Sequence, residues 1–246
     1  MTHKNVVVLS LASDFGCQVQ ISNFPELLDM IGSIDLSYWQ LATSGHMPDT
    51  YDVAVIEGAV TTEEHVELLK QAREIASCVI AIGACACTGG VVGLALNQDL
   101  EGAVNTVYGK DAKKVAWGHI APRPVKDVID VDFQVMGCPI NPAEFSYILQ
   151  RAVQGLTDSP HRETLCAECK INENLCFYKE KKVCLGLVTA GGCNSGCVNR
   201  GRACTGCRGI AQDANIEAAR EFAAKFDLED ELMSALEVYN SARKES

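Results

Sequence analysis

The cysteines constrain this chain more than any other feature of its sequence. There are 13 among 246 residues, which is an odd number, and the N-terminus (MTHKNVVVLS) lacks the pattern of a secretory signal peptide. A disulfide framework of the kind found in small secreted proteins is therefore not expected. Metal or cluster binding is the better interpretation, and the chain must then fold so that distant thiols meet.

The cysteines divide into two sets along the chain. The first part contains Cys17, Cys78, Cys85, Cys87 and Cys138, and the second contains Cys166, Cys169, Cys176, Cys184, Cys193, Cys197, Cys204 and Cys207. A polar stretch at residues 155–160 (GLTDSP) separates the two sets. It predicts a domain boundary there, with one domain over residues 1–155 and a smaller one over 156–246.

The first part alternates between strand-like and helix-like segments. The apolar runs 6–11, 51–57, 78–82 and 131–136 are typical of buried strands, and the segments 21–31, 61–76 and 142–153 are predicted to be helices. This βαβ alternation predicts an α/β fold with a doubly wound parallel sheet. The second part has little periodicity between residues 166 and 207, so we expect loops there, followed by helices over 213–225 and 228–243.

Three thiol-bearing loops follow strands of the predicted sheet. They contribute Asp14 and Cys17, then Cys85, then Cys138. Open α/β sheets build their sites at the carboxyl ends of strands, so these loops are predicted to converge on one cofactor. The alternative is a set of unrelated buried cysteines, since free cysteine is often buried.

Three other residues near these loops are not predicted to be ligands. Cys78 lies inside a strand and is assigned to the core, while Cys87 is interpreted as a neighbour of the ligand Cys85. Glu57 ends a strand at the same sheet edge. Contact with the cofactor surroundings or a large subunit, and an acid at a helix entry, are both open for Glu57.

The eight cysteines of the second part form two groups of four. The first quartet has the spacing C-x2-C-x6-C-x7-C from Cys166 to Cys184, and the second has C-x3-C-x6-C-x2-C from Cys193 to Cys207. Four thiolates are the usual ligand set of a [4Fe-4S] cluster. Two structural zinc ions are the alternative. The separate site in the first part favours clusters, because a row of redox centres gives all three sites one purpose.

These motifs resemble the small subunits of [NiFe] hydrogenases over almost the whole chain. The resemblance includes the loop before Cys17, the segments GACACTGG and GCPI, both quartets, and ACTGCRG around Cys204 and Cys207. It is strongest to the cytoplasmic multimeric types. These are the sulfhydrogenase delta subunit, the gamma subunit of the methyl-viologen-reducing hydrogenase that serves heterodisulfide reductase, and the small subunits of bacterial NAD(P)-linked bifurcating complexes.

The resemblance implies a flavodoxin-like first domain and three [4Fe-4S] clusters. The proximal cluster would use Asp14, Cys17, Cys85 and Cys138, the distal cluster the first quartet, and the medial cluster the second. Cys166 occupies the place of a histidine in periplasmic relatives. Cys197 replaces a proline there, so a four-iron medial cluster is expected instead of a three-iron one. The family normally has C-x2-C in the first loop, and Asp14 stands where its first cysteine would be.

The resemblance also implies a function. The chain would relay electrons between the nickel–iron site of a large subunit and a diaphorase-type flavin or iron–sulfur subunit, or heterodisulfide reductase, and would not be catalytic alone. The final acceptor (NAD, NADP, ferredoxin, coenzyme F420 or heterodisulfide reductase) stays open. A hydrogen-sensing regulatory subunit, the quinone-reductase subunit of complex I and a zinc-stabilised binding module are the alternatives.

Charge and hydropathy limit the partners and the location. The net charge of −11 does not favour a nucleic-acid partner. No apolar run approaches the roughly 20 residues that span a bilayer, so we expect no membrane span and a cytoplasmic protein.

Overall fold

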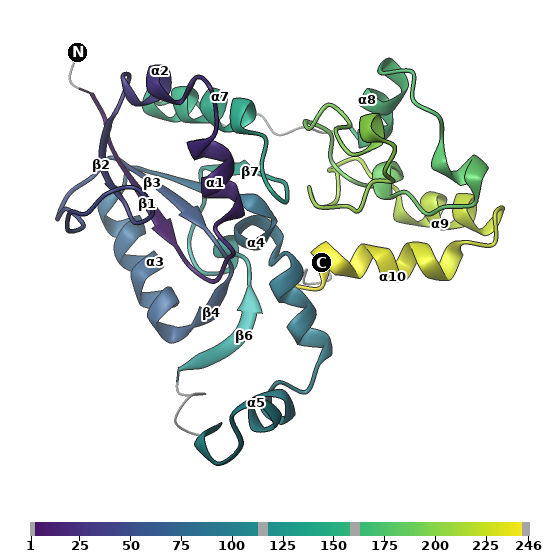
Figure 1. Ribbon diagram of the computed structural model, residues 1–246, viewed down its shortest axis with the longest axis horizontal. Helices are drawn as coiled ribbons and strands as arrows, with labels where there is room; N and C mark the ends of the chain where they lie inside the picture. Colours follow the sequence, from purple (N-terminus) through teal and green to yellow (C-terminus); the bar gives the residue numbers. More distant parts are fainter. Residues whose placement is uncertain (1–2, 113–117, 158–162, 243–246) are drawn as a thin grey trace.

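A parallel sheet forms the centre of the first part of the chain (Figure 1). The computed structural model describes residues 3–112, 118–157 and 163–242. The strands of this sheet are β1 (Asn5–Ser10), β2 (Asp35–Trp39), β3 (Val53–Glu57), β5 (Cys78–Ile82) and β7 (Phe133–Val135). They lie in the order β2-β1-β3-β5-β7, with every neighbouring pair parallel. This is the 2-1-3-4-5 order of flavodoxin-like folds, so the predicted α/β class is confirmed.

Helices cover both faces of the sheet because its apolar side chains alternate between them. Val6 and Val8 of β1 pack with α1 (Gly16–Ser22), α2 (Leu27–Ile31) and α7 (Pro142–Val153). The intervening Val7 and Leu9 pack on the other face, with α3 (Glu63–Ile75) and α4 (Gly83–Thr88). Every residue of β3 and β5 is buried, as expected for central strands covered on both sides.

The local signals of the predicted helices are largely present. The side chain of Thr62 caps α3 by accepting the N–H of His65, and Asn141 caps α7, with Pro142 in its first turn. The helix predicted over 21–31 is wrong. The chain instead forms α1, which begins earlier, and α2, with a turn over residues 23–26 between them.

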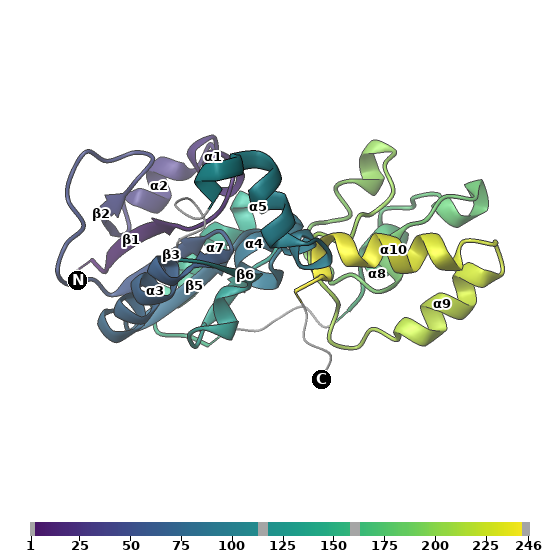
Figure 2. The same cartoon turned by 90° about the horizontal axis from the view of Figure 1, so that it is seen from below.

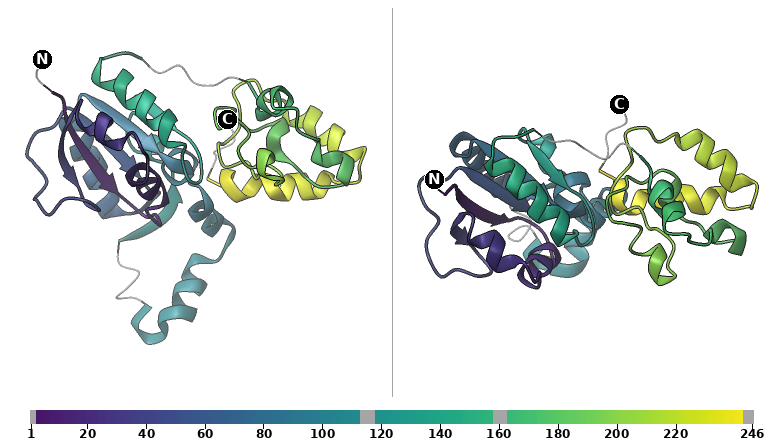
Figure 3. Two further views of the ribbon diagram at one scale, coloured as in Figure 1. Left: turned by 45° about the horizontal axis from the view of Figure 1, so that its top comes forward. Right: turned by 90° about the horizontal axis from the view of Figure 1, so that it is seen from above.

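Several elements of the first part carry too weak a pattern to be predicted. They are β2, the antiparallel pair β4 (Val60–Thr62) and β6 (His119–Arg123), the 3-10 helix η1 (Val91–Asn97) and the helix α5 (Leu100–Tyr108). β2 is an edge strand that is mostly half-buried, and α5 has no buried residue. Figure 3 shows α5 projecting away from the sheet, so no core contact imposes an apolar pattern on it.

The cysteine-rich part has its own small core. Helix α8 (Leu165–Ile171) begins it, and α9 (Ile216–Ala224) and α10 (Glu229–Asn240) end it, which confirms the two predicted C-terminal helices. Between them the chain forms loops and three 3-10 turns, η4 (Phe177–Glu180), η5 (Leu185–Leu187) and η6 (Val198–Arg200). The buried Tyr178 ring packs against Phe222 and Phe226, with ring centroids 5.2 and 5.6 Å away.

Helix α10 connects the two parts of the molecule (Figure 2). Its C-terminal end packs against η1 and α4. Ala242 is buried there against Gly89, where an added Cβ would come within 2.5 Å of the Ala242 Cβ. Within the described residues, no helix combines the length and apolar character that crossing a bilayer requires.

Candidate metal centres

The three strand-end loops of the first part meet around one cavity, which we call the proximal site. Asp14, Cys17, Cys85 and Cys138 all line it, and its volume is about 50 Å³. The loops are brought together because β1, β5 and β7 are parallel and end at the same edge of the sheet. All four side chains that the sequence predicts for this site are therefore neighbours.

Cys17 is held by a buried polar network. Its backbone N–H donates to Glu57 Oε1 at 3.0 Å, and the Gln18 side chain donates to Glu57 Oε2 at 2.7 Å. The Trp39 indole donates to Gln18 Oε1 at 2.6 Å. Glu57 is 2% exposed and also lines the proximal site, so contact with the site surroundings is the role that the structure gives it.

The backbone also comes unusually close to Cys17. Gly83 has φ +83°, and an added Cβ there would lie 2.6 Å from Cys17 Sγ. Burial and the nearby Glu57 raise the pKa of the Cys17 thiol above its ordinary range. Burial, followed by Cys138, raises the pKa of the Cys85 thiol to about 11. The structure thus gathers desolvated thiols that would ionise readily only beside a positive charge.

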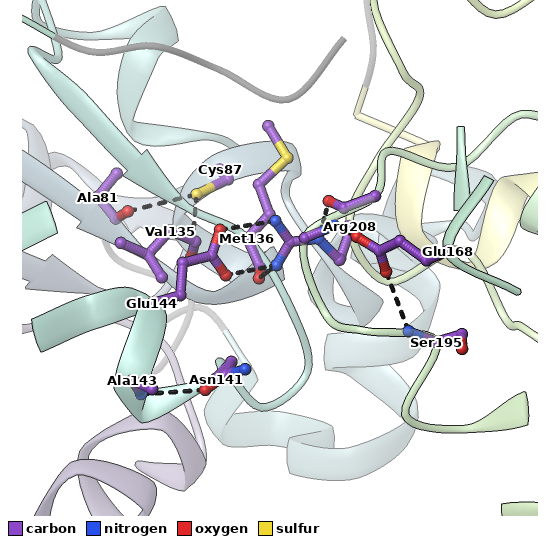
Figure 4. Close-up of polar contacts among 12 residues, drawn as sticks. Ala81, Cys87, Val135, Met136, Asn141, Ala143, Glu144, Glu168, Ser195 and Arg208 are labelled. Atoms are coloured by element: carbon purple, nitrogen blue, oxygen red, sulfur yellow. Dashed lines mark hydrogen bonds and ion pairs between the residues drawn. The ribbon is translucent and has the colours of Figure 1, made fainter. Parts of the chain in front are cut away.

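Cys78 and Cys87 lie outside the proximal site. Cys87 is buried, and its thiol points to the carbonyl oxygens of Ala81 at 3.5 Å and Val135 at 3.9 Å (Figure 4). Cys78 is buried in β5 and belongs to the sheet core. Neither residue lines the cavity that Cys85 lines.

Asp14 is exposed and engages its own loop. Its Oδ1 accepts the N–H of Gly16 at 3.0 Å, a local turn that aspartate often makes. The carboxylate is also close enough to Cys85 to contribute to the raised pKa of that thiol. Asp14 therefore lies at the rim of the site with one oxygen occupied by the backbone.

The first quartet comes together at one end of the cysteine-rich part. Burial raises the pKa of the Cys166 thiol to about 11, and Cys184, Cys169 and Cys176 add to the rise. An added Cβ on Gly186 would lie 3.6 Å from Sγ of both Cys166 and Cys184. The four predicted members of this quartet are thus neighbours.

The second quartet lies between the proximal site and the first quartet. A cavity of about 640 Å³ is lined by Cys193, Cys197 and Cys207 on one side and Cys138 on the other. Burial raises the pKa of Cys207 to about 11, and a hydrogen bond from the Cys138 backbone opposes that rise. Cys204 is buried, and burial raises its pKa to about 12, with Cys184 and Cys207 contributing.

Direct contacts give the order of the three sites. Cys207 is next to Cys138 of the proximal site, and the Cys204 N–H donates to Cys184 Sγ of the first quartet at 3.3 Å. The Cys204 carbonyl also accepts the N–H of Leu185 at 2.9 Å. The second quartet is therefore the middle one, and the first quartet is farther along the chain of contacts.

The donor chemistry fits iron–sulfur clusters. All 13 cysteines are free thiols. Among the described residues, no three His, Cys, Asp or Glu side chains are close enough to hold one metal ion, so the quartets are not closed around a single ion as in a structural zinc site. Four thiolates that raise one another's pKa require a cationic core between them, which an iron–sulfur cluster supplies.

Several residues around these sites were not found from the sequence. They are Gln18, Trp39, Glu144, Glu168, Arg208 and Tyr239. Three of them had a local signal, since Gln18 and Arg208 directly follow a predicted ligand and Glu168 lies between two. For the others only the tertiary contacts reveal a role. Burial and the Cys138 thiol raise the pKa of Tyr239, which places its hydroxyl beside the proximal site.

The chain is similar to known proteins over most of its length. The family model described as NADH ubiquinone oxidoreductase, 20 Kd subunit, matches residues 15–152. Sulfhydrogenase 2 subunit delta of Pyrococcus furiosus is 33% identical over 234 residues, covering 94% of this chain and 97% of that protein. A vhu subunit of the F420-non-reducing hydrogenase of Methanocaldococcus jannaschii is 27% identical, covering 83% and 81%.

Solved structures share the fold. A chain of an NAD⁺-reducing [NiFe]-hydrogenase superposes with a TM-score of 0.55 at 24% identity, covering 64% of this chain and 96% of that one. A chain of the Dm. baculatum [NiFeSe]-hydrogenase gives 0.56 at 16% identity, covering 87% and 96%. The fold is thus that of [NiFe] hydrogenase small subunits. The chain belongs to the NADH ubiquinone oxidoreductase 20 Kd subunit family, and within it to the small, electron-transferring subunits of multimeric hydrogenases.

Proposed function

We propose that this chain relays electrons through three [4Fe-4S] clusters between the nickel–iron site of a large hydrogenase subunit and a further redox subunit. The proximal cluster would be held by Cys17, Cys85 and Cys138, with Asp14 at the fourth corner. The second quartet would hold the medial cluster and the first quartet the distal one. The proposed division into domains at residues 155 and 156 separates the proximal site from the other two.

The contact order of the thiols carries this proposal. Cys138 and Cys207 are neighbours, and Cys204 and Cys184 are joined by a hydrogen bond. Three separate structural metal sites would not need to touch in series. A relay does, because electron transfer between centres slows steeply as their separation grows.

The chain's own residues would set the properties of the relay. Clusters supply one-electron redox chemistry when bound, and their potentials depend on ligand type, hydrogen bonds to sulfur and burial. Glu57 fixes the backbone at Cys17 and places a carboxylate beside the proximal site. The exposed Cys176 leaves the first quartet open to solvent, as an exit toward a partner requires.

The partners follow from the relatives. The P. furiosus and M. jannaschii proteins are named as hydrogenase subunits, which supports a large hydrogenase subunit as the partner at the proximal site. A diaphorase-type flavin or iron–sulfur subunit, or heterodisulfide reductase, would bind at the distal end. We expect this assembly in the cytoplasm, acting on H2 as a complex.

The alternatives have less support. The family model named for the 20 Kd subunit ends at residue 152, before both quartets, whereas the sulfhydrogenase relative covers 94% of the chain. A complex I role therefore leaves the quartets unexplained. A zinc-stabilised module and a hydrogen sensor are separated from the relay by experiment.

The test is the metal content of the chain in its purified complex, after subtraction of the partners' iron. Three four-iron clusters predict about twelve irons and as many acid-labile sulfides. Zinc in place of iron would refute the relay. Slow turnover with every flavin or ferredoxin acceptor would favour the sensor instead.

A further inference from the structure

Arg208 joins the two parts of the chain through a buried ion pair. Its Nη1 and Nη2 donate to the two carboxylate oxygens of Glu144, both at 2.7 Å. Arg208 belongs to the cysteine-rich part, and Glu144 belongs to α7 beside the sheet. Their side chains are only 4% and 13% exposed. Figure 4 shows the two planar groups facing each other across the junction.

The same guanidinium also holds the backbone on both sides. Nη1 donates to the carbonyl of Met136 at 2.6 Å, and Nε donates to the carbonyl of Gly191 at 2.7 Å. Met136 is two residues before Cys138, and Gly191 is two residues before Cys193. Arg208 itself directly follows Cys207. One side chain thus contacts segments adjoining thiols of both the proximal site and the second quartet.

The geometry is that of an orienting contact. A bidentate guanidinium–carboxylate pair restricts distance and angle together, which a lysine ammonium cannot do. Removing one partner would leave an uncompensated buried charge, so the pair resists separation of the two parts. Other ion pairs, such as Arg220 with Glu229 at 2.6 Å, join more exposed side chains within the cysteine-rich part.

We propose that Arg208 is a positioning residue that fixes the second quartet against the Cys138 loop, and so sets the separation and orientation of the proximal-to-medial electron step. This inference rests on the proposed relay. In that step one electron leaves the reduced proximal centre and reduces the medial centre by one electron. The guanidinium exchanges neither electron nor proton and acts through geometry alone.

The experiment compares Arg208→Lys and Glu144→Gln with the wild-type complex, and uses Arg220→Lys as the matched control. Arg208→Lys keeps the charge but loses the bidentate contact, and Glu144→Gln keeps the shape but loses the charge. Three quantities are measured. They are the iron content, the amide hydrogen exchange of a peptide over residues 133–145, and the rate of medial-cluster reduction followed by freeze-quench electron paramagnetic resonance after exposure to H2.

Both test variants are expected to keep wild-type iron content. Exchange in the 133–145 peptide should rise roughly tenfold or more, because the local opening that the buried pair resists becomes easier. Reduction of the medial cluster should slow while reduction of the proximal cluster does not. Arg220→Lys should match wild type in all three measurements.

Two results would overturn the positioning role. One is wild-type exchange and wild-type medial reduction in both variants. The other is loss of medial iron in both variants with unchanged exchange over 133–145, since Arg208 would then only support its own quartet. Absence of iron from the wild type would refute the relay and the electron step with it, whereas the exchange data would still decide whether the pair holds the junction.

Discussion

The backbone N–H of Cys204 donates to Cys184 Sγ at 3.3 Å, although the two cysteines belong to different quartets. This bond joins the middle of the proposed relay to its far end. Hydrogen bonds to ligand sulfurs are among the factors that set cluster potentials. The contact therefore links the two sites in both position and electrostatics, and the predictions below test the order that it implies.

Replacing Cys169 by Ala should separate electron exit from hydrogen chemistry. Transfer to the physiological acceptor is expected to collapse, because the distal cluster loses a ligand. Hydrogen–deuterium exchange at the nickel–iron site should largely survive, since it needs no long-range electron transfer. Cys78→Ala is the control, because Cys78 lies in the sheet core, and it should leave both activities in place. Loss of both activities in an assembled Cys169→Ala complex would contradict the order.

Asp14 is predicted to ligate the fourth iron of the proximal cluster through oxygen, alone or in exchange with solvent. Its carboxylate is a harder ligand than thiolate, and it lines the site although Oδ1 accepts the Gly16 N–H. Asp14→Cys and Asp14→Ala should then both shift the proximal potential and its electron paramagnetic resonance signal. An unchanged signal and potential in both variants would show that Asp14 only closes its loop.

Glu168 is expected to hold the two quartets together. Its carboxylate accepts the N–H of Gly192 and, at 3.0 Å, that of Ser195, on either side of Cys193. Glu168→Gln should lower the unfolding free energy by about 1–3 kcal/mol, the range for hydrogen bonds to a charged group, and should weaken retention of medial iron. Glu173→Gln, at an exposed position nearby, is the control. Equal thermal and chelator stability of the two variants would rule out this role.

Gly83→Ala should disrupt the proximal site selectively. The new Cβ would lie 2.6 Å from Cys17 Sγ, and φ is +83° there. We expect loss of about four irons, those of one four-iron cluster, with both quartets retained. Gly109→Ala provides a matched control, because φ is also positive (+52°) but no atom lies within 4 Å of the added Cβ. Iron analysis and the proximal resonance signal measure the difference, and full iron content in Gly83→Ala would contradict the close approach.

The local elements of the fold were largely predictable from the sequence. The buried runs at β3 and β5 and the capped helices α3 and α7 carry their signals within a few residues. The failures follow from weak local signals. α5 buries nothing and β2 is an edge strand, so neither displays the periodicity that burial in a core imposes.

The candidate site divides in the same way. The sequence by itself determined the spacing of the two quartets and the three strand-end loops, because chain connectivity fixes which thiols are near neighbours along the backbone. Only the tertiary structure decided which quartet is in the middle. It also paired Arg208 with Glu144, 64 residues away, and Gln18 with Trp39 and Glu57. Such pairs form when packing brings distant elements together and leaves their buried polar groups no other partner, a condition that no local pattern records.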